Sequence, residues 1–304
     1  MDISALIIAY NDKRATLNCL NYLLQQTIPL KLIIIVDNSE ETIFFADETY
    51  AKNVCIIRNN ANLGVASALN IGFTYAIDNG YRWCWTFDQD SEPLPNALEE
   101  LENSIRFLDE RDVKDVGIIA STGISRKYNT LYRGNLAKWV HPFKKIKRIN
   151  VCYECDLSLT AGSLTSLEFV SKHGGARSDF FIDWVDFELC IRMKKNNFKI
   201  YCCQTSYYKH QIGGDIEYAK NNKERSVISL FRKYMLIRNS TMTILYYSSG
   251  FFRFFYYPLF IIREYFNAEI EGKNKIFIHA IMDGVMKNTG KVNAFSDVEK
   301  IVYR

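Results

Sequence analysis

Two carboxylates stand one residue apart at positions 88 and 90, in the stretch WCWTFDQDSE, directly after an aromatic-rich apolar run. Carboxylate oxygens are hard ligands of the kind that Mg²⁺ and Mn²⁺ prefer, so Asp88 and Asp90 could hold a cation for a substrate that carries phosphate. An Asp-x-Asp sequence is also common in ordinary turns. The neighbouring elements must decide between these two interpretations.

A second acidic group lies in the stretch IDWVDFELCIRMKKNN, which is predicted to be a helix over 182–197. On such a helix Asp183 and Asp186 share a face, because they are three residues apart. Glu188 points largely away from Asp186 and lies four residues before Arg192, which suits a surface ion pair. These acids could supply a general base, or they could stabilise the first helical turn through its dipole.

The elements around the first pair alternate between buried strands and helices. Apolar runs without polar alternation predict strands at 3–10, 31–37, 53–58 and 82–88, and helical spacing predicts helices at 13–26 and 64–80. This alternation is typical of an α/β fold with a mostly parallel, Rossmann-like sheet that has helices on both faces.

Polar residues follow the strands of this predicted sheet. Asn11, Asp37 and Asn59 come at strand ends, as do Asp88 and Asp90. Ligands of such sheets bind beyond the carboxyl ends of the strands. The sequence therefore predicts a ligand site on one rim, where the Asp-x-Asp pair is more than a turn.

The stretch NNANLGVASALNIG adds small residues and amide side chains that suit close approach to a diphosphate, among them Asn62, Gly64 and Asn70. It matches neither the dinucleotide fingerprint nor the P-loop. The net charge of +4 is mild and does not indicate a nucleic-acid partner, although residues 126–148 are basic without any acid. Eight cysteines include one C-x-x-C, Cys152 and Cys155, which lies in a predicted strand and faces two sides, so free thiols are favoured over zinc.

Several motifs occur in a characteristic order: IIAYN, IIIVDNSE, NNANLGVASALNIGF, TFDQDS, LTAGSL, FFIDWVDFELCIRMKKNNFKI, KHQIGG and RKYMLIRN. In this order the chain resembles the inverting family 2 glycosyltransferases with the GT-A fold, over about residues 3 to 240. Within that family it is most similar to bacterial rhamnosyltransferases of cell-surface polysaccharide synthesis, such as O-antigen or capsule, and less to galactofuranosyltransferases.

The resemblance implies roles for individual residues. It places Ala9, Tyr10 and Asn11 along the nucleotide, Asp37 on the pyrimidine base, and Asn62 and Gly64 beside the ribose and diphosphate. It makes Asp90 the principal ligand of Mg²⁺ or Mn²⁺, with Asp88 on the ribose or sugar side and His210 completing the metal or diphosphate contacts. On the acceptor side it implies Gly162, Ser163 and Trp184, although Trp184 could equally be a core residue.

Inverting transfer needs a carboxylate that takes the proton from the acceptor hydroxyl as it attacks the anomeric carbon. The family pattern aligns this base with Asp186, and Asp183 is then expected to position the acceptor. The donor is expected to be dTDP-L-rhamnose, with a UDP-sugar as the alternative, and the acceptor a glycan linked to polyprenyl diphosphate. A nucleotidyltransferase is disfavoured because AYNDKRAT lacks a glycine, and a non-catalytic nucleotide-sugar or membrane-binding protein remains the alternative from another class.

The expected organisation is a catalytic domain at 1–220 and a helical C-terminal extension at 221–304. The segment at 242–262 is rich in Phe and Tyr but contains Arg253 and Pro258, which suits a membrane interface better than a span, while packing in the core or in a homo-oligomer stays open. The N-terminus has no signal-peptide pattern. The protein is therefore expected in the cytoplasm, at the inner face of the cell membrane.

Overall fold

The computed structural model describes residues 2–44, 50–126, 131–132, 151–210, 216–218, 224–226, 229–248, 250–268 and 273–289. The chain divides into two compact units. The first, which we call the sheet unit, comprises Met1–Leu136, Lys145–Ser178 and Asp186–Gln211. The second, the helical unit, comprises Ala137–Lys144, Asp179–Val185 and Ile212–Arg304. The short stretch Asp179–Val185 thus belongs with residues that follow it by a long way in the chain.

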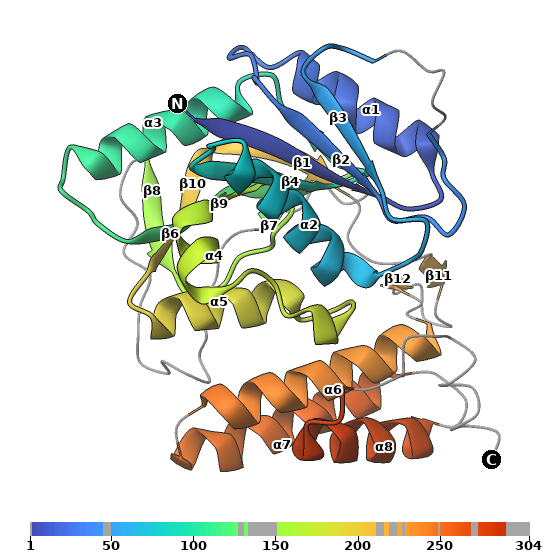
Figure 1. Ribbon diagram of the computed structural model, residues 1–304. Coiled ribbons are helices and arrows are strands. Elements are labelled where there is room, and N and C mark those ends of the chain that lie inside the picture. The colour runs from blue at the N-terminus through green and yellow to red at the C-terminus, as the bar shows by residue number, and fades with distance from the viewer. Residues whose placement is uncertain are drawn as a thin grey trace. The chain divides into compact units, whose positions relative to one another are not determined.

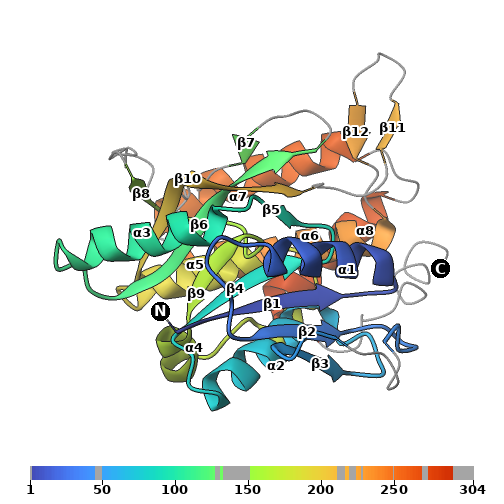
Figure 2. The same cartoon turned by 90° about the horizontal axis from the view of Figure 1, so that it is seen from above.

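The sheet unit contains one sheet of ten strands, in which eight lie in the order β3-β2-β1-β4-β9-β6-β10-β5 (Figure 2). The strands are β1 Ile3–Ala9, β2 Ile33–Asp37, β3 Val54–Arg58, β4 Trp83–Asp88, β5 Glu92–Pro93, β6 Val116–Ser125, β7 Leu131–Tyr132, β8 Cys152–Cys155, β9 Ser163–Ser166 and β10 Lys199–His210. The first four are parallel, and β9 is antiparallel to both β4 and β6. Because β6 and β10 pair in parallel, their carboxyl ends lie at the same edge as those of the first four strands.

Helices cover both faces of this sheet (Figure 1). Helices α1 Lys13–Leu24 and α3 Ala97–Asp109 share one apolar core with alternate strand residues such as Ile7 and Trp85. Helix α2 Gly64–Asp78 packs on the opposite face of β1 and β2, where Gly72 lies against Leu6. Helices α4 Leu167–His173 and α5 Val185–Lys195 pack on β6, β8 and β10 through a separate core. The predicted α/β sheet with helices on both faces is confirmed.

Strand β10 continues to His210, well past the apolar run FKIYCC at 198–203. Its pairing with β6 shifts register between Cys202 and Tyr207, so β10 contains extra residues opposite two steps of β6. Such a bulge lets a strand continue through residues that break the apolar run. The bulge places His210 beside Ser125 at the carboxyl edge.

The cysteines of the C-x-x-C sequence occupy β8, where Cys152 packs in the core under α3 and Cys155 in the core under α5. All eight cysteines lie among the described residues and all are free thiols. The two residues face opposite sides of the sheet as predicted, so they do not form a shared metal site.

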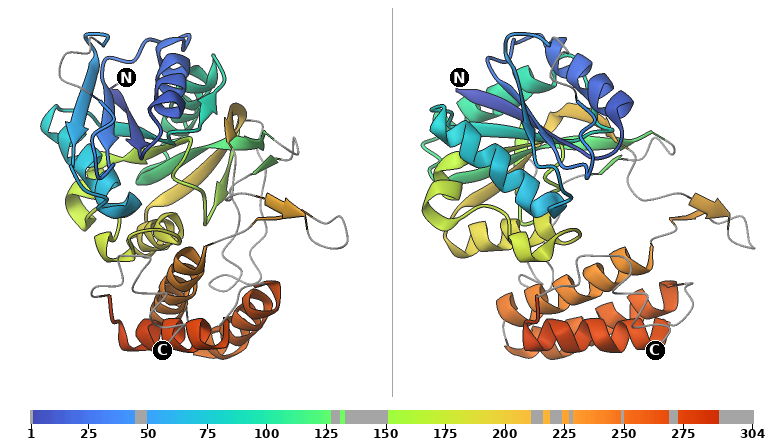
Figure 3. Two further views of the ribbon diagram at one scale, coloured as in Figure 1. Left: turned by 90° about the vertical axis from the view of Figure 1, so that its right-hand side faces the viewer. Right: turned by 45° about the vertical axis from the view of Figure 1, so that its right-hand side comes forward.

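The helical unit contains α6 Leu230–Tyr247, α7 Gly250–Asn267 and α8 Lys273–Met286, with α6 packed against both others (Figure 3). A small antiparallel ribbon of β11 Ile216–Tyr218 and β12 Glu224–Ser226 precedes them and was not predicted. The aromatic segment at 242–262 falls across the end of α6 and most of α7, and not on one helix. Within the described ranges, every helix is too short or too polar to span a bilayer.

Candidate active site

The Asp-x-Asp pair lies in the tight connection between β4 and β5. Asp88 is the last residue of β4, and the backbone N–H of Ser91 donates to the carbonyl of Asp88 at 3.0 Å, which closes a turn. Strand β5 then pairs antiparallel with β10, so that Glu92 lies opposite Lys209. The segment is therefore a turn, and it also directs two carboxylates toward the end of β10.

His210 lies between the two carboxylates. Its Nδ1 atom is 3.1 Å from Asp90 Oδ1, and its Nε2 atom is 3.6 Å from Asp88 Oδ2. The Nδ1 atom is buried and has no hydrogen-bond partner among the described residues. The structure thus brings together the three residues that the sequence assigned to a metal.

The electrostatics of this group favour the charged forms. Burial alone would lower the pKa of His210, but the Asp90 and Asp88 carboxylates beside it raise that pKa above its ordinary value. Burial acts to raise the pKa of Asp90, yet the imidazole of His210 and the charge of Arg126 outweigh it and lower that pKa. The two carboxylates favour a positive charge at this point, which a bound cation would supply in place of the imidazole proton.

The group suits a divalent cation on two observations. One ligand atom from each of Asp88, Asp90 and His210 lies within 4.8 Å of the others. The imidazole also holds a buried nitrogen without a hydrogen bond, which coordination would satisfy. Two carboxylate oxygens and one imidazole nitrogen form a donor set that accepts Mg²⁺ or Mn²⁺.

Two further residues hold the Asp-x-Asp turn in place, and neither was predicted from the sequence. Gln89 forms two hydrogen bonds with the backbone of Tyr10, accepting from its N–H at 2.6 Å and donating to its carbonyl at 3.0 Å. Arg126, at the end of β6, donates to the carbonyl of Asp90 and lies 3.0 Å from Glu92 Oε1. Gln89 therefore ties the pair to the end of β1, and Arg126 ties it to β6. The basic run that begins at Arg126 otherwise falls almost entirely outside the described residues.

On the donor side, Asp37 ends β2 and is buried. Its carboxylate accepts hydrogen bonds from the backbone N–H groups of Ser39 and Ile43 and from the hydroxyl of Thr42, at 2.8–3.1 Å. The carboxylate thereby shapes the loop after β2, and Ser39 in turn accepts from the backbone N–H of Asn11. The contact that the resemblance implies between Asp37 and a base stays a prediction.

An amide network joins the ends of β2 and β3 to the start of α2. Asn38, buried at the carboxyl edge, donates to Asn62 Oδ1 at 3.2 Å and accepts from the Asn59 side chain and the Leu63 backbone. Asn62 Oδ1 also accepts from the N–H of Gly64, whose φ of 81° lies in the left-handed region that favours glycine. Asn38 could have been found from the sequence, since it follows Asp37 directly at the strand end.

The other residues that were predicted to contact the nucleotide lie at the end of β1. Ala9 is buried, Tyr10 has 42% of its surface exposed, and Asn11 has a left-handed φ of 52° that Asn tolerates. Asn70, which the sequence offered as a donor toward the ligand, is instead used inside the fold. Its amide exchanges two hydrogen bonds with the backbone of Ala176, both at 2.7 Å.

Tyr208 is a buried side chain of β10 in the sheet unit. Burial, and then the charges of Asp88, Asp186 and Asp90, raise the pKa of its phenol. Asp186 is in the first turn of α5 and accepts from the backbone N–H of Phe187 at 2.8 Å. The charges of the predicted base and of the two predicted carboxylate ligands thus act on one buried aromatic side chain of the sheet unit.

Gly162 fits against the same ring. Its φ is 73°, and a Cβ at this position would lie 2.4 Å from the Tyr208 ring, so only glycine is accommodated. Ser163 is fully buried in β9, and its hydroxyl donates to the carbonyl of Leu159 at 2.6 Å. The Ser163 side chain therefore supports the turn before β9 instead of facing an acceptor.

The helix that was predicted over 182–197 begins only at Val185. Asp183 and Trp184 have left-handed φ values of 61° and 64°, so the argument that Asp183 and Asp186 share a helical face is wrong. Both residues belong to the helical unit, where Asp183 binds Arg232 and the Trp184 ring packs edge-on against Phe260 at 5.6 Å. The Phe260 contact shows that Trp184 is packed on one side.

Glu188 forms the predicted ion pair with Arg192, at 3.0 Å, but the pair is not on the surface. The Glu188 side chain is fully buried, and Arg192 also donates to the carbonyls of His173, Gly174 and Gly175. The segment before α5 covers the pair, which the spacing along one helix could not reveal. Glu188 is therefore a structural residue.

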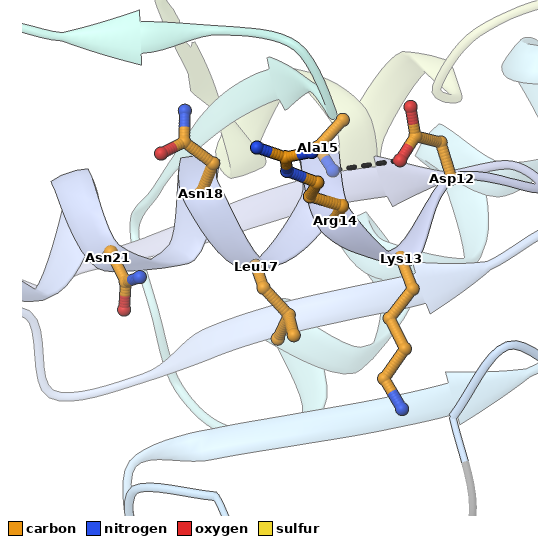
Figure 4. A pocket seen from close by; sticks show the side chains of 7 residues that line it. All are labelled: Asp12, Lys13, Arg14, Ala15, Leu17, Asn18 and Asn21. Carbon is orange, nitrogen blue, oxygen red and sulfur yellow. Dashed lines mark hydrogen bonds between the residues drawn. The ribbon is translucent and has the colours of Figure 1, made fainter.

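A separate hollow runs along α1 and is lined by residues between Asp12 and Asn21, including Lys13 and Arg14 (Figure 4). Asp12 caps this helix by accepting from the N–H of Ala15 at 2.9 Å. The residues assigned to the donor, the metal and the acceptor are absent from its lining.

The family model of glycosyl transferase family 2 matches residues 4–164, which is more than half of the chain. Among curated proteins, the chain is similar to dTDP-rhamnosyl transferase RfbF of Shigella flexneri, with 24% identity over 250 residues that cover 80% of each chain.

Two solved structures have similar folds. S. aureus TarS 1–349 in complex with UDP has a TM-score of 0.57 at 13% identity, over 100% of this chain and 93% of that one. GalNAc-T7 with UDP, GalNAc and Mn²⁺ also has a TM-score of 0.57, at 14% identity, over 94% of this chain and 56% of that one. At such identities the likeness shows the fold alone, and it confirms the GT-A fold.

Proposed function

Because this chain belongs to glycosyl transferase family 2, we propose that it transfers L-rhamnose from dTDP-L-rhamnose to a hydroxyl of a growing bacterial surface glycan. The similarity to dTDP-rhamnosyl transferase RfbF carries the choice of donor, since it extends over most of both chains. A UDP-hexose is the second candidate donor, because the similar TarS structure contains UDP.

We propose that Asp90, with Asp88 and His210, holds Mg²⁺ or Mn²⁺ at the carboxyl edge. When bound there, the ion supplies Lewis-acid stabilisation of the departing diphosphate. The GalNAc-T7 structure contains Mn²⁺, which supports a divalent ion for this fold. Arg126 steadies the backbone of Asp90 and adds a positive charge beside the donor phosphates.

The proposed reaction is a single displacement with inversion at the anomeric carbon. Asp186 accepts the proton of the acceptor hydroxyl. The hydroxyl oxygen forms the new bond to the anomeric carbon, as the bond from that carbon to the diphosphate oxygen breaks. The nucleoside diphosphate leaves with the electron pair of the broken bond. Ala9, Tyr10, Asn11, Asp37, Asn62 and Gly64 are proposed to hold the nucleotide, and Gly162, Asp183 and Trp184 to lie on the acceptor side.

We further propose that α7 and α8 attach the protein to an anionic membrane that carries a lipid-linked acceptor. Large apolar side chains are exposed at helical spacing on α7, namely Phe255, Leu259, Ile262 and Phe266, and on α8, namely Ile278, Met282 and Val285. We call these the apolar faces of α7 and α8. Exposed apolar surface on this scale is unusual for a protein that contacts only water.

The charges beside the apolar faces favour lipid over a second protein copy. On α7, α8 and the residue that follows α8, the exposed charged side chains within the described part are Arg263, Lys275 and Lys287, all basic. The acids there, Glu264 and Asp283, are partly buried and bonded to other side chains. A cationic rim around an apolar face suits the anionic headgroups of a bilayer.

The donor assignment is tested by hydrolysis of dTDP- and UDP-sugars, each measured with Mg²⁺, with Mn²⁺ and with EDTA. The proposal expects dTDP-L-rhamnose to be the best substrate and EDTA to abolish its turnover. Faster turnover of UDP-hexoses would select the second candidate. Absence of turnover for every donor, with nucleotide sugars bound, would favour a non-catalytic binding protein.

A further inference from the structure

The stretch Asp179–Trp184 has an unfavourable backbone. Phe181, Asp183 and Trp184 all have left-handed φ values, between 58° and 64°, although none is glycine. For bulky residues this conformation is a genuine outlier that persists only where its surroundings impose it. Something must therefore hold these residues in place.

Helix α6 supplies the restraint within the helical unit. The amide of Asn239 lies 2.9 Å from each of the carbonyl oxygens of Phe180, Ile182 and Asp183, to which it donates. Asn239 is fully buried, and its Oδ1 accepts from Arg238 Nε at 3.0 Å, which fixes the orientation of the amide. One side chain thus satisfies three carbonyls of an irregular backbone that has no strand partner of its own.

Two arginines of α6 hold the ends of the same stretch. Arg238, also fully buried, donates to the carbonyl of Asp179 at 2.9 Å. Arg232 forms a two-pronged pair with the Asp183 carboxylate, with Nη2–Oδ1 at 2.7 Å and Nε–Oδ2 at 3.2 Å. We call Arg232, Arg238 and Asn239 the α6 clamp.

We propose that the α6 clamp is a positioning device: it holds in place the stretch that contains Asp183, the residue proposed to position the acceptor. The clamp binds the Asp183 side chain and the carbonyls of Asp179, Phe180, Ile182 and Asp183, which directly precede Trp184. The chain runs directly from Trp184 into α5, the helix that contains Asp186. This inference rests on the proposed function for its catalytic readout, but the restraint itself can be measured separately.

The decisive variant is Asn239→Leu, which keeps the size of the side chain and removes its N–H donors. A matched control is Thr243→Val, because Thr243 is equally buried in α6 but its hydroxyl donates to the carbonyl of Asn239, within its own helix. Both variants remove buried polar groups from one helix. Only the first removes hydrogen bonds to the clamped stretch.

Two measurements test the proposal. Amide hydrogen exchange at residues 179–184 should be at least about 10-fold faster in Asn239→Leu than in Thr243→Val, since local opening loses its restraint. Transfer to the acceptor should fall by at least about 10-fold while acceptor-independent donor hydrolysis stays unchanged, because misplacement affects the acceptor alone. Wild-type exchange and wild-type transfer in a folded Asn239→Leu protein would overturn the proposal.

A milder variant keeps the test valid if Asn239→Leu does not fold. Arg232→Lys preserves the charge of a partly exposed side chain but loses its two-pronged geometry. It should raise the KM for the acceptor and leave the KM for the donor unchanged, whereas a purely structural role would change neither. If the wild-type protein turns over no donor, the proposed function fails, and hydrogen exchange still decides whether the clamp exists.

Discussion

The carboxyl edge of the sheet is built from strands whose register fixes each side chain, whereas residues 179–184 consist of irregular backbone restrained by the α6 clamp. Asp88 and His210 lie where β4 and β10 end, and neighbouring strands determine both positions. The Asp183 carboxylate and the carbonyls of Phe180, Ile182 and Asp183 are held by side chains of α6, about 50 residues further along the chain. The predicted metal ligands are thus positioned by sheet geometry, and the predicted acceptor residue Asp183 by long-range polar contacts that few substitutions would suffice to break.

The largest effect is expected for Asp90→Asn, which removes charge from the proposed metal site but preserves size. Transfer should fall by about 10³-fold, since electrostatic stabilisation of the leaving group is usually the largest single contribution to catalysis. The matched control is Asp112→Asn, because Asp112 is exposed and pairs only locally with Lys114. Full activity of Asp90→Asn, or of the wild type in EDTA, would contradict the metal assignment.

The next largest effect is expected for Asp186→Asn, which tests the proposed base separately from the donor site. Asp186→Asn cannot accept a proton, so turnover should fall by roughly 10²-fold or more. Donor affinity, followed by calorimetry, should barely change, because Asp186 acts on the acceptor hydroxyl. A variant with normal turnover would remove Asp186 from the mechanism.

Glu188→Gln should act on stability and not on chemistry, which sharpens the contrast with Asp186. The substitution leaves Arg192 without its buried carboxylate partner, and it should lower the free energy of unfolding by about 2–4 kcal/mol. Urea denaturation gives this value, and activity per folded molecule should remain near that of the wild type. A folded, stable and inactive Glu188→Gln protein would instead make Glu188 the base.

The smallest effect on chemistry is expected at the apolar faces. Replacing Phe255 and Leu259 of the apolar faces, together with the exposed Phe254 beside them, with Ser should release the protein from anionic vesicles, while donor hydrolysis continues unchanged. Leu24→Ser is the control, since Leu24 is an exposed apolar residue of α1 in the sheet unit. Phe251 and Phe252 belong to the same aromatic segment, but their side chains lie outside the described residues. Wild-type protein that does not sediment with vesicles would count against attachment.

The strands that form the carboxyl edge were largely predictable from the sequence. Strands that are buried on both faces appear as continuous apolar runs, and here they end in polar residues. The strand pattern did not predict the position of His210, because a bulge carries β10 past the end of its apolar run. Gln89 and Arg126 were missed because their roles depend on backbone partners that strand pairing brings close.

The backbone conformation of residues 179–184 was less predictable for a physical reason. Left-handed φ values at Phe181, Asp183 and Trp184 have no sequence signature, since nothing local favours them over a helix. The helix was therefore predicted to begin three residues too early. The distant contacts of Asn239 and Arg232 hold the backbone before α5 in its non-helical conformation.

The central claim is that the carboxyl edge binds a dTDP-sugar through a divalent ion. Calorimetry of dTDP-L-rhamnose binding, with Mn²⁺ and with EDTA and beside UDP-glucose and GDP-mannose, tests it most directly. We predict that dTDP-L-rhamnose binds most tightly of the three and only when Mn²⁺ is present. Equal binding in EDTA, or tighter binding of either other donor, would contradict the account.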